Sequence, residues 1–498
     1  FLFAALNILK PLYDACIQRM EGFVEDLETA GKHDPKKFKD FRDTLLKSKE
    51  HPKPDYFILK AIIVNNLFGV DIMEEAVEIC KLRLFLKLVA QVESQDRIEP
   101  LPDIDFNIRA GNTLIGYTQL ADISPARGIR TDEENQLLLA IEDKALTLDA
   151  KVRTFRLQQT QLDGTVTTED KAQLTYDFRD LEDELNDYLS GAFGVKQGAI
   201  KKWKSAVKPF HWFCDFHSIM QSGGFDVLIG NPPYIEMAKI RAQYDLREFI
   251  TLPTGNLYAP VVERAVSLTH EASRFGMIIP LSFSCTDRMS ELREVVERAS
   301  SNIWVSHFSG DANPSKLFEG VKLRLDILLT KKGSPDSIFS GHYLKWFADA
   351  RPQLFWNIRY AEVVPDARHL GLIPKTGSEV GNSILRYIAL KQPLALALGN
   401  SERTLYIHRV ITQFVKGFDF IPYFCNETDG VKKSDDYKPF SFRNDRASLI
   451  AMAILNSSTF FYWFIALGDC FHCGKEYIHT FPISLEEISE QIGDRLAA

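Results

Sequence analysis

A short apolar run that ends in two consecutive prolines constrains the fold of this chain more than any other stretch. Residues 225–229 read Phe-Asp-Val-Leu-Ile after a Gly-Gly turn, which predicts a buried strand. Residues 230–234, Gly-Asn-Pro-Pro-Tyr, follow directly. Prolines cannot donate hydrogen bonds to a strand ladder, so they end the strand and stiffen the turn. The stretch therefore predicts a rigid loop at the carboxyl end of a strand, where open α/β sheets place their ligands.

The side chains of this loop indicate the kind of ligand. Asn231 offers an amide oxygen and an amide nitrogen, Pro232 a backbone carbonyl in a stiff segment, and Tyr234 a flat ring. Together they suit a planar amine or amide. The alternative interpretation is a proline-stiffened surface turn capped by a tyrosine, which the preceding strand and the order of the later elements disfavour.

A second strand end lies upstream, at Asp71. Residues 62–71, Ile-Ile-Val-Asn-Asn-Leu-Phe-Gly-Val-Asp, approach it. A carboxylate at the tip of a parallel strand is the usual partner of ribose hydroxyls, because it accepts two hydrogen bonds at once. Asp71 is therefore the candidate ligand of a cofactor ribose. Its alternative role is to cap the helix that follows, which is apolar at Val77, Leu84 and Leu88, and the two roles are compatible.

The stretch at 225–234 resembles the catalytic motif of S-adenosylmethionine-dependent amino-methyltransferases. With its flanking segments it resembles adenine-N6 DNA methyltransferases of restriction–modification and phage-defence systems, in the gamma-class, type IIG-like order with cofactor motifs first and target recognition last. The resemblance implies an α/β fold with a Rossmann-like SAM-dependent methyltransferase sheet, S-adenosyl-L-methionine as cofactor and double-stranded DNA as partner. It makes Asn231, Pro232, Pro233 and Tyr234 catalytic, and it gives Asn231 a cofactor contact as well.

Further site positions follow from the same resemblance. Residues 69–89 are similar to the family's second cofactor segment and residues 106–114 to its third, where Asn112 stands at a place that commonly holds Asp. The Asn112 amide oxygen can accept a hydrogen bond from the adenine amine of the cofactor, or the residue is an ordinary turn residue. Phe318 is the candidate that stacks on the flipped base opposite Tyr234. Its alternative role is a turn hydrophobe that faces the core.

The order of elements predicts four regions. Residues 1–120 form the first part of the methyltransferase domain, incomplete at its N-terminus because the family's Gly-rich cofactor loop is missing from the chain. Residues 121–205 form a helical-hairpin insertion, since apolar residues recur three and four apart on either side of a turn signal at 163–165. Residues 206–335 form the catalytic part of the domain. Residues 336–498 form an aromatic-rich C-terminal α+β target-recognition domain.

Two local signals lie within and just after the predicted hairpin. Thr167, with Asp170 three residues on, predicts a capped start for the second helix. Residues 201–208 carry four lysines around Trp203, an arrangement that suits a phosphate backbone. A solvated helix end explains the lysines almost as well.

Composition excludes some classes of protein. A net charge of −8 argues against a protein that coats nucleic acid indiscriminately, although it permits a local basic cleft. Seven scattered cysteines argue against a disulfide framework and predict a cytoplasmic location. Cys470 and Cys473 have metal-like spacing, but without a second pair we expect buried thiols and no metal. No apolar run reaches membrane-span length, so no membrane partner is expected.

The resemblance implies a site-specific DNA methyltransferase of restriction–modification or phage defence. It transfers a methyl group from S-adenosyl-L-methionine to the N6 amine of adenine in double-stranded DNA by base flipping, and an upstream nuclease domain or a defence-system partner is its expected associate. Two alternatives stay open. One is a protein-glutamine or RNA amino-methyltransferase, although the large region after residue 335 argues against a glutamine substrate. The other is a catalytically inactive DNA-binding component, suggested by the missing Gly-rich loop and by Asn112.

Overall fold

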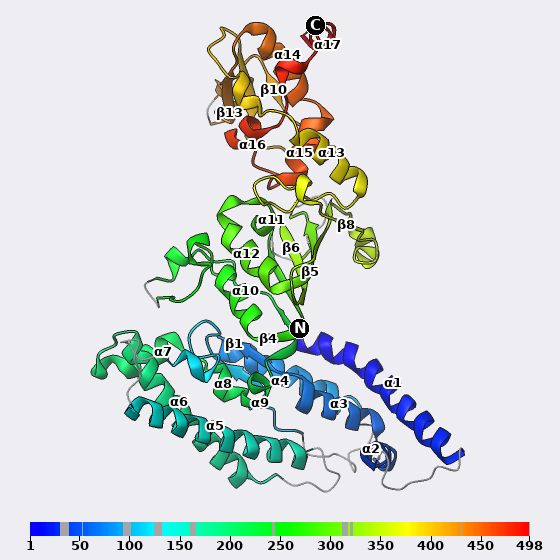
Figure 1. The fold of residues 1–498 in the computed structure, drawn as a ribbon, viewed down its shortest axis with the longest axis vertical. Coiled ribbons are helices and arrows are strands. Elements are labelled where there is room, and N and C mark those ends of the chain that lie inside the picture. Colours follow the sequence, from blue (N-terminus) through cyan, green and yellow to red (C-terminus); the bar gives the residue numbers. More distant parts are fainter. Residues whose placement is uncertain are drawn as a thin grey trace. The chain divides into compact units, whose positions relative to one another are not determined.

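The chain divides into two compact units. The computed structural model describes residues 1–29, 39–51, 53–92, 101–123, 132–159, 166–241, 245–310, 317–318, 322–428 and 430–497. Unit 1 comprises Phe1–Phe225 and Ile240–Leu246, and unit 2 comprises Asp226–Lys239 and Arg247–Ala498 (Figure 1). The predicted turn at 163–165 and the residues at 319–321, next to Phe318, lie outside the described residues.

Unit 1 holds a small parallel sheet among helices. β1 (Gly69–Asp71) pairs in parallel with β2 (Ile108–Ala110), so that Asp71 lies opposite Ala110. The helices of this part are α1 (Leu2–Thr29), α2 (Lys39–Glu50), α3 (Pro54–Asn66) and α4 (Glu74–Val89). α3 begins at a proline, whose fixed φ and missing N–H suit the first turn of a helix. In α4 the predicted apolar stripe is confirmed, since Val77, Leu84 and Leu88 are its buried residues and join the core of this unit.

A long helical hairpin follows in unit 1. α5 (Asp132–Gln159) and α6 (Thr168–Ala192) lie side by side (Figure 1). Ion pairs join Lys144 to Glu184 at 2.8 Å and Lys151 to Asp177 at 2.6 Å, a pairing order that makes the two helices antiparallel. The predicted cap is also confirmed, because the Thr167 hydroxyl accepts from the backbone N–H of residue 170 at 3.1 Å. Shorter helices complete the unit: α7 (Ile200–Val207), α8 (Trp212–Asp215) and α9 (His217–Gln221).

Unit 2 contains a six-stranded mixed sheet in the order β3-β4-β6-β5-β7-β8. β4 and β5 both run antiparallel to β6, β5 is parallel to β7, and β7 is antiparallel to β8. The strands are β3 (Phe225–Gly230), β4 (Thr269–Pro280), β5 (Ser300–Phe308), β6 (Leu325–Lys332), β7 (Ser337–Leu344) and β8 (Tyr360–Glu362). Through β7 and β8 the sheet continues past residue 335.

Helices cover one face of this sheet. α10 (Tyr258–Ser267) and α12 (Ser290–Ala299) pack on β4 and β5, and α11 (Ser282–Cys285) lies beside α12. Their apolar side chains meet those of the strands in a buried core that includes Tyr258, Val262, Leu292, Phe275 and Val305. The predicted α/β class is confirmed as a mixed α/β architecture. Within the described residues β1 and β2 form a two-stranded sheet in unit 1, and β3 belongs to the six-stranded sheet. The Rossmann-like arrangement of the sheet stays a prediction.

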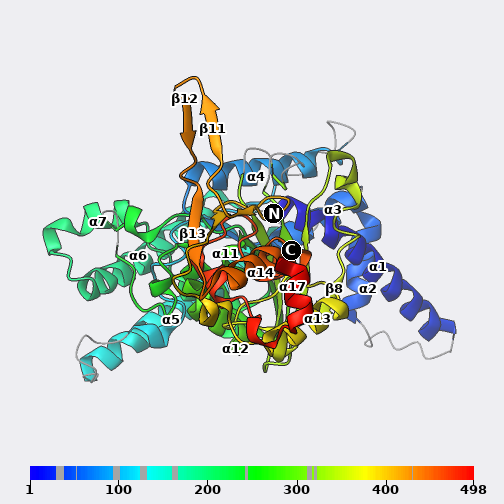
Figure 2. The same cartoon turned by 90° about the horizontal axis from the view of Figure 1, so that it is seen from above.

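The C-terminal part of unit 2 combines a small sheet with helices. β9 (Thr404–His408) lies between β10 (Gly417–Phe418) and β13 (Tyr437–Ser441), and β11 (Tyr423–Asn426) pairs with β12 (Gly430–Lys433) as a separate hairpin that projects in Figure 2. The helices are α13 (Glu379–Ala389), α14 (Asp445–Leu455), α15 (Ser458–Leu467), α16 (Lys475–Thr480) and α17 (Glu490–Ala497). The aromatic run at 460–464 forms part of α15, where Phe460, Trp463 and Phe464 are buried in the core.

Within the described residues no single helix is long and apolar enough to cross a membrane. α14 and α15 reach that length and composition only together, as a pair bent by 63°.

Candidate active site

The end of β1 holds Asp71 at the surface. The backbone N–H of Gly111 donates to the Asp71 carbonyl at 2.8 Å, which joins the ends of the two parallel strands. Asp71 Oδ1 accepts from the backbone N–H of Met73 at 2.8 Å, and Met73, not Asp71, occupies the N-cap position of α4. The alternative role of Asp71 as N-cap is therefore wrong in detail. Its second oxygen accepts no hydrogen bond from any residue that the structure describes, so the carboxylate keeps an open acceptor at this strand end.

Asn112 lies just beyond β2 at the same edge of the small sheet, only 3% exposed. Its Oδ1 accepts from the backbone N–H of Leu114 at 3.1 Å, whereas its Nδ2 has no hydrogen-bond partner in the described part of the chain. The backbone N–H of Asn112 donates to the Lys208 carbonyl at 2.7 Å. Next to it, a Cβ at Gly111 would come within 2.8 Å of the Phe210 side chain, so this close approach requires glycine. An unpaired buried amide N–H costs about 1–3 kcal/mol, which favours a ligand or a water molecule at this place.

A partly buried ion cluster lies close to the Asn112 segment in the chain, at Arg109 of β2. Arg109 on β2 pairs with Glu182 of α6 at 2.5 Å and with Asp215 of α8 at 2.8 Å. Its guanidinium also lies 4.8 Å from the ring centre of Phe178. The helical hairpin is thereby fixed to the strand that carries the predicted cofactor segment. Sequence reasoning missed this cluster, because its members lie far apart in the chain and share no motif.

The predicted loop follows β3. Gly230 ends the strand where a Cβ would come within 2.9 Å of the Met277 sulfur. Asn231 is exposed and Pro232 is buried. On the far side of the loop the backbone N–H of Leu257 donates to the Ile235 carbonyl at 2.8 Å, which holds the chain after the prolines. The strand and the turn are as predicted. The expected burial of the strand is wrong, because β3 is the edge strand of its sheet and exposes Val227 and Ile229.

Tyr234 bends back over this loop. Its hydroxyl lies 2.6 Å from Asn231 Oδ1 and 2.8 Å from the carbonyl oxygen of Ile278 on β4. Burial raises the pKa of Tyr234 to about 12, so the phenol keeps its proton at neutral pH. The ring is half-buried and packs against a core cluster that contains Phe308 and Leu317. Asn231, Pro232, Pro233 and Tyr234 thus form one compact loop at the end of β3.

Phe318 lies beside this cluster and is 39% exposed. Its neighbour Leu317 is buried in the cluster against which Tyr234 packs. Leu317, not Phe318, therefore takes the core-facing role that was the alternative for Phe318. Among the described residues no ring contact joins Phe318 to Tyr234. The predicted site residues consequently fall into two groups, Asp71 with Asn112 in unit 1 and the Tyr234 loop with Phe318 in unit 2.

A serine–histidine–aspartate arrangement lies inside the six-stranded sheet. His307 Nδ1 is 2.7 Å from Asp326 Oδ1, and its Nε2 is 2.9 Å from the Ser340 hydroxyl. Ser284 donates to the other oxygen of Asp326 at 2.6 Å. Burial lowers the pKa of His307, so the ring is neutral and donates to the carboxylate. All four residues are fully buried, and the network therefore holds α11 and three strands together and offers no surface to a substrate.

Other predicted features have structural explanations. In the basic patch Lys204 pairs with Asp183 at 2.8 Å and Lys208 with Glu74 at 2.8 Å, which favours the interpretation as a helix end over a phosphate site. Cys470 and Cys473 are buried free thiols, as expected. Within the described ranges no three His, Cys, Asp or Glu side chains gather as a metal site.

Solved structures with similar chains include DNA complexes of restriction–modification enzymes. The type IIL restriction-modification enzyme MmeI in complex with DNA is 12% identical, with 98% of this chain and 68% of that chain covered and a TM-score of 0.34. A nuclease-deletion mutant of the type ISP restriction-modification enzyme LlaGI, in complex with a DNA substrate mimic, is 10% identical. That comparison covers 81% of this chain and 41% of the other, with a TM-score of 0.27.

Sequence comparison gives the family. A putative type II restriction enzyme and methyltransferase of Methanocaldococcus jannaschii, RM.MjaORFECS2P, is 30% identical over 275 residues. The match covers 47% of this chain and 23% of the relative, so the chain spans about a quarter of the length of that protein. Residues 65–313, which are half of the 498 residues, match the model of the Eco57I restriction-modification methylase. The chain therefore belongs to the Eco57I restriction-modification methylase family.

Proposed function

We propose that the chain carries the methyltransferase part of a restriction–modification or phage-defence enzyme, which methylates the N6 amine of adenine in double-stranded DNA. The observation that carries this proposal is the pairing of Asn231 with Tyr234 on the loop after β3. The loop lies inside the segment that matches the family. An amide beside an aromatic ring, on a loop stiffened by two prolines, suits a planar amine.

The Tyr234 hydroxyl orients the Asn231 amide. It lies within hydrogen-bond distance of two oxygens, Asn231 Oδ1 and Ile278 O, yet a phenol donates only one proton. All three groups are satisfied when the hydroxyl donates to Ile278 O and accepts from Asn231 Nδ2. This requires the Asn231 side-chain amide to be turned by 180°, so that Oδ1 and Nδ2 exchange places. Asn231 Oδ1 then points away from Tyr234. In this orientation it is open to accept a hydrogen bond from a substrate amine.

Positioning provides most of the catalysis in the proposed reaction. The exocyclic amine of adenine is a poor nucleophile, because its lone pair is delocalised into the ring. Asn231 Oδ1 and the Pro232 carbonyl accept hydrogen bonds from its two protons, and the amine becomes more pyramidal and more nucleophilic. Neither group has to act as a strong base, since orientation and preorganised dipoles lower the barrier.

The edge of the small sheet in unit 1 fits S-adenosyl-L-methionine, which supplies an electrophilic methyl group when bound. The open oxygen of Asp71 accepts from the ribose hydroxyls. Asn112 donates its unpaired Nδ2 to a ring nitrogen of the adenine, because its Oδ1 is already bound to the Leu114 N–H. This role differs from the acceptor role that the sequence predicts for Asn112.

The target base must leave the duplex before its amine reaches the loop. Tyr234 stacks on the flipped adenine, and Phe318, which is exposed, is the second stacking candidate. Residues 336–498 select the target sequence, and the chain works in the cytoplasm with an upstream nuclease domain or a defence-system partner. The predicted four regions with boundaries at 120, 205 and 335 belong to the same proposal.

The test follows labelled methyl groups from S-adenosyl-L-methionine, with the full-length protein that carries this chain. We expect N6-methyladenine in duplex DNA and its loss in the variant Asn231→Ala. Asn302→Ala, on β5, removes an amide elsewhere and serves as the matched control. Label in glutamine or in RNA would contradict the proposal in favour of the amino-methyltransferase alternative. Failure of calorimetry to detect cofactor binding would favour the inactive DNA-binding component.

A further inference from the structure

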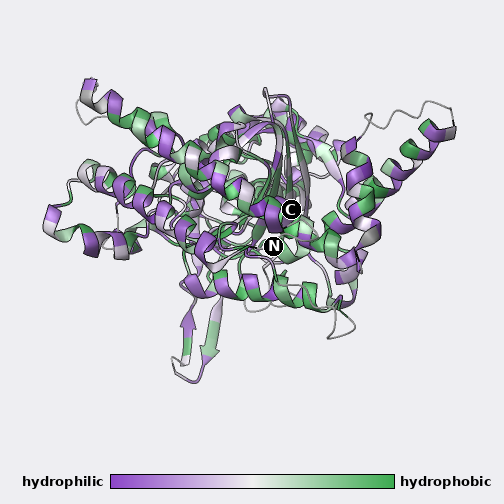
Figure 3. Ribbon diagram, turned by 90° about the horizontal axis from the view of Figure 1, so that it is seen from below, coloured by the Kyte–Doolittle hydropathy of each residue, from purple (hydrophilic) through white to green (hydrophobic). Residues whose placement is uncertain are grey.

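The β11–β12 hairpin exposes aromatic and basic side chains in register. Tyr423 pairs with Lys433 and Phe424 with Lys432 across the two strands. The ammonium groups of the lysines lie 6.0 Å and 5.3 Å from the ring centres of Tyr423 and Phe424. Tyr423 is 66% exposed and Val431, near the turn, is 71% exposed. The ribbon, which projects from the rest of the C-terminal part, thus carries both apolar and hydrophilic residues (Figures 2 and 3).

Such a hairpin has little to stabilise it alone. A two-stranded ribbon without a third strand or a covering helix is marginally stable in water. Exposed aromatic residues on a projecting element mark an interaction surface. A two-stranded ribbon also has the width that the major groove of duplex DNA accepts, and lysine heads on it reach phosphates.

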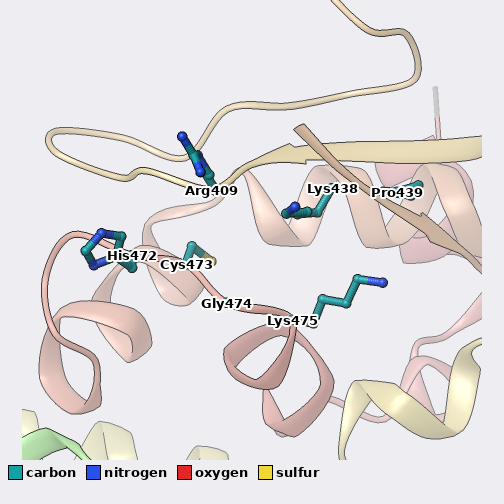
Figure 4. Close-up of a pocket in the computed structure, with 7 residues that line it drawn as sticks. All are labelled: Arg409, Lys438, Pro439, His472, Cys473, Gly474 and Lys475. Carbon is teal, nitrogen blue, oxygen red and sulfur yellow. The ribbon is translucent and has the colours of Figure 1, made fainter. Parts of the chain in front are cut away.

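A basic pocket lies at the base of the hairpin. It has a volume of about 380 Å³ and is lined by Arg409, Lys438, Pro439, His472, Cys473, Gly474 and Lys475 (Figure 4). Four of these side chains are basic and none is a carboxylate. Arg409 pairs with Asp436 at 2.6 Å and His472 Nδ1 lies 2.8 Å from Asp469 Oδ2, whereas Lys438 and Lys475 make no ion pair within the part of the chain that the structure describes. These two lysines suit an anion such as a phosphodiester.

A short connection, residues 434–436, links the hairpin to the wall of the pocket. β12 ends at Lys433 and β13, which carries Lys438, begins at Tyr437. The backbone N–H of Arg409 donates to the Asp436 carbonyl at 2.8 Å, so the pocket wall holds the connection between the two strands. If one phosphate of a ligand bound in the pocket, it would thus also fix where the β11–β12 hairpin lies on that ligand.

We propose that pocket and hairpin together contact the target duplex, with a backbone phosphate in the pocket and the β11–β12 hairpin in the adjacent major groove. The inference rests on the proposed function, since it takes duplex DNA as the substrate. Phosphate contacts fix register and carry no sequence information, whereas groove contacts read bases. The pocket lysines therefore set affinity and its salt dependence, and the hairpin sets the sequence that is methylated.

The pocket is tested by salt titration of DNA binding without cofactor. Lys438→Ala combined with Lys475→Ala removes the cations that neutralise the proposed phosphate, so the slope of log K against log salt becomes shallower by about 0.9. Arg19→Ala combined with Arg179→Ala removes two exposed cations from helices of unit 1 and leaves the slope unchanged. An unchanged slope in the pocket variant overturns the pocket assignment. Because this assay needs no methyl transfer, it gives its answer even if the proposed reaction is wrong.

The hairpin is tested by mapping methylated sites. Tyr423→Thr combined with Phe424→Thr keeps residues that favour strands and removes both rings. We expect methylation at the native site to fall about tenfold or more and at least one position of the site to become degenerate. The inference is overturned if the wild-type protein methylates DNA and the hairpin variant methylates the same sites at the same rate. That result leaves the proposed function intact. If the hairpin variant instead loses a dimer that the wild-type protein forms in solution and still methylates the same sites, the hairpin contacts a second copy of the chain. That result overturns the inference as well.

Discussion

The ends of β2 and β3 each present an asparagine, but they hold its amide in opposite ways. Asn112 is buried, with its oxygen bound to a backbone N–H and its nitrogen without a partner in the described residues. Asn231 is exposed, and the Tyr234 side chain holds its amide. Burial orients the first amide and leaves one atom for a ligand. A neighbouring hydroxyl orients the second and leaves the rest of the amide free for substrate.

The difference separates binding from reaction. A buried amide with one unpaired atom gains free energy whenever a fitting ligand arrives, so it contributes to affinity. An exposed amide on a stiff loop gains little from binding but can stabilise charge that develops during reaction. Substitutions at the end of β2 should therefore change cofactor affinity, and substitutions at the end of β3 should change turnover.

The largest effect is expected for Asn231→Ala. It removes the acceptor oxygen that faces the amine, and loss of one preorganised group of this kind lowers kcat by about 10²–10³. Cofactor affinity, measured by calorimetry, should fall much less than turnover, because Asp71 and Asn112 are unchanged and only the contact that the resemblance gives Asn231 is lost. Asn231→Asp keeps an acceptor in the same place and is the matched control, expected to retain more turnover than Asn231→Ala. If Asn231→Ala were as active as the parent protein, the assignment of turnover to the end of β3 and of cofactor binding to the end of β2 would be contradicted.

The second effect is expected for Asp71→Asn. The amide retains the hydrogen bond from the Met73 N–H but loses the charge, and a hydrogen bond to a charged group contributes about 1.5–3 kcal/mol. The dissociation constant of S-adenosyl-L-methionine should rise by about 10- to 100-fold, with turnover at saturating cofactor nearly unchanged. Glu75→Gln removes the same charge from the first turn of α4 and should leave the dissociation constant unaffected. A fall in kcat without a change in affinity would contradict the assignment of Asp71.

Local patterns in the sequence predict the elements of both strand ends. The run at 225–229 and the prolines after it give a strand and a stiff turn, and the apolar stripe of α4 and the capped start of α6 are also as predicted. Each of these depends on neighbours within about four residues, where propensity and periodicity operate. The position of Asp71 at the tip of β1 belongs to the same class.

Partners that come from distant segments could not be predicted in this way. Ile278, which binds the Tyr234 hydroxyl, lies 44 residues downstream, and Glu182 lies 73 residues from Arg109. No spacing rule connects such residues, because packing of whole elements brings them together. The same holds for the edge position of β3, which leaves a run of apolar residues exposed where the composition predicts burial. The basic pocket between β9, β13 and α16 likewise has no local signal.

A smaller effect is expected for Tyr234→Phe. The ring and its stacking face remain, but the Asn231 amide loses the hydroxyl that orients it and Ile278 O loses a donor. A neutral hydrogen bond contributes about 0.5–1.5 kcal/mol, so kcat should fall by about two- to tenfold while the affinity for a duplex with an unpaired target base stays the same. Tyr234→Ala removes the ring as well and should weaken that affinity. Equal losses of affinity in the two variants would show that the hydroxyl, not the ring, holds the base.

The smallest effect is expected for Asn112→Asp. The direction of the change in cofactor affinity distinguishes a donor role of Asn112 from an acceptor role. The substitution keeps an acceptor for the Leu114 N–H and replaces the unpaired Nδ2 donor by a second acceptor. If Nδ2 donates to a ring nitrogen of the cofactor, the dissociation constant of S-adenosyl-L-methionine should rise by about two- to fivefold, the low end for one neutral hydrogen bond. If the adenine amine donates to residue 112, the carboxylate should bind it better and the constant should fall. An analogue that carries hydrogen in place of that amine separates the cases. Its ring nitrogens still accept hydrogen bonds, so its binding to the parent protein weakens only if the amine donates to Asn112. Tighter binding by Asn112→Asp would therefore restore the acceptor role that the sequence predicts and contradict the donor role that the buried amide suggests.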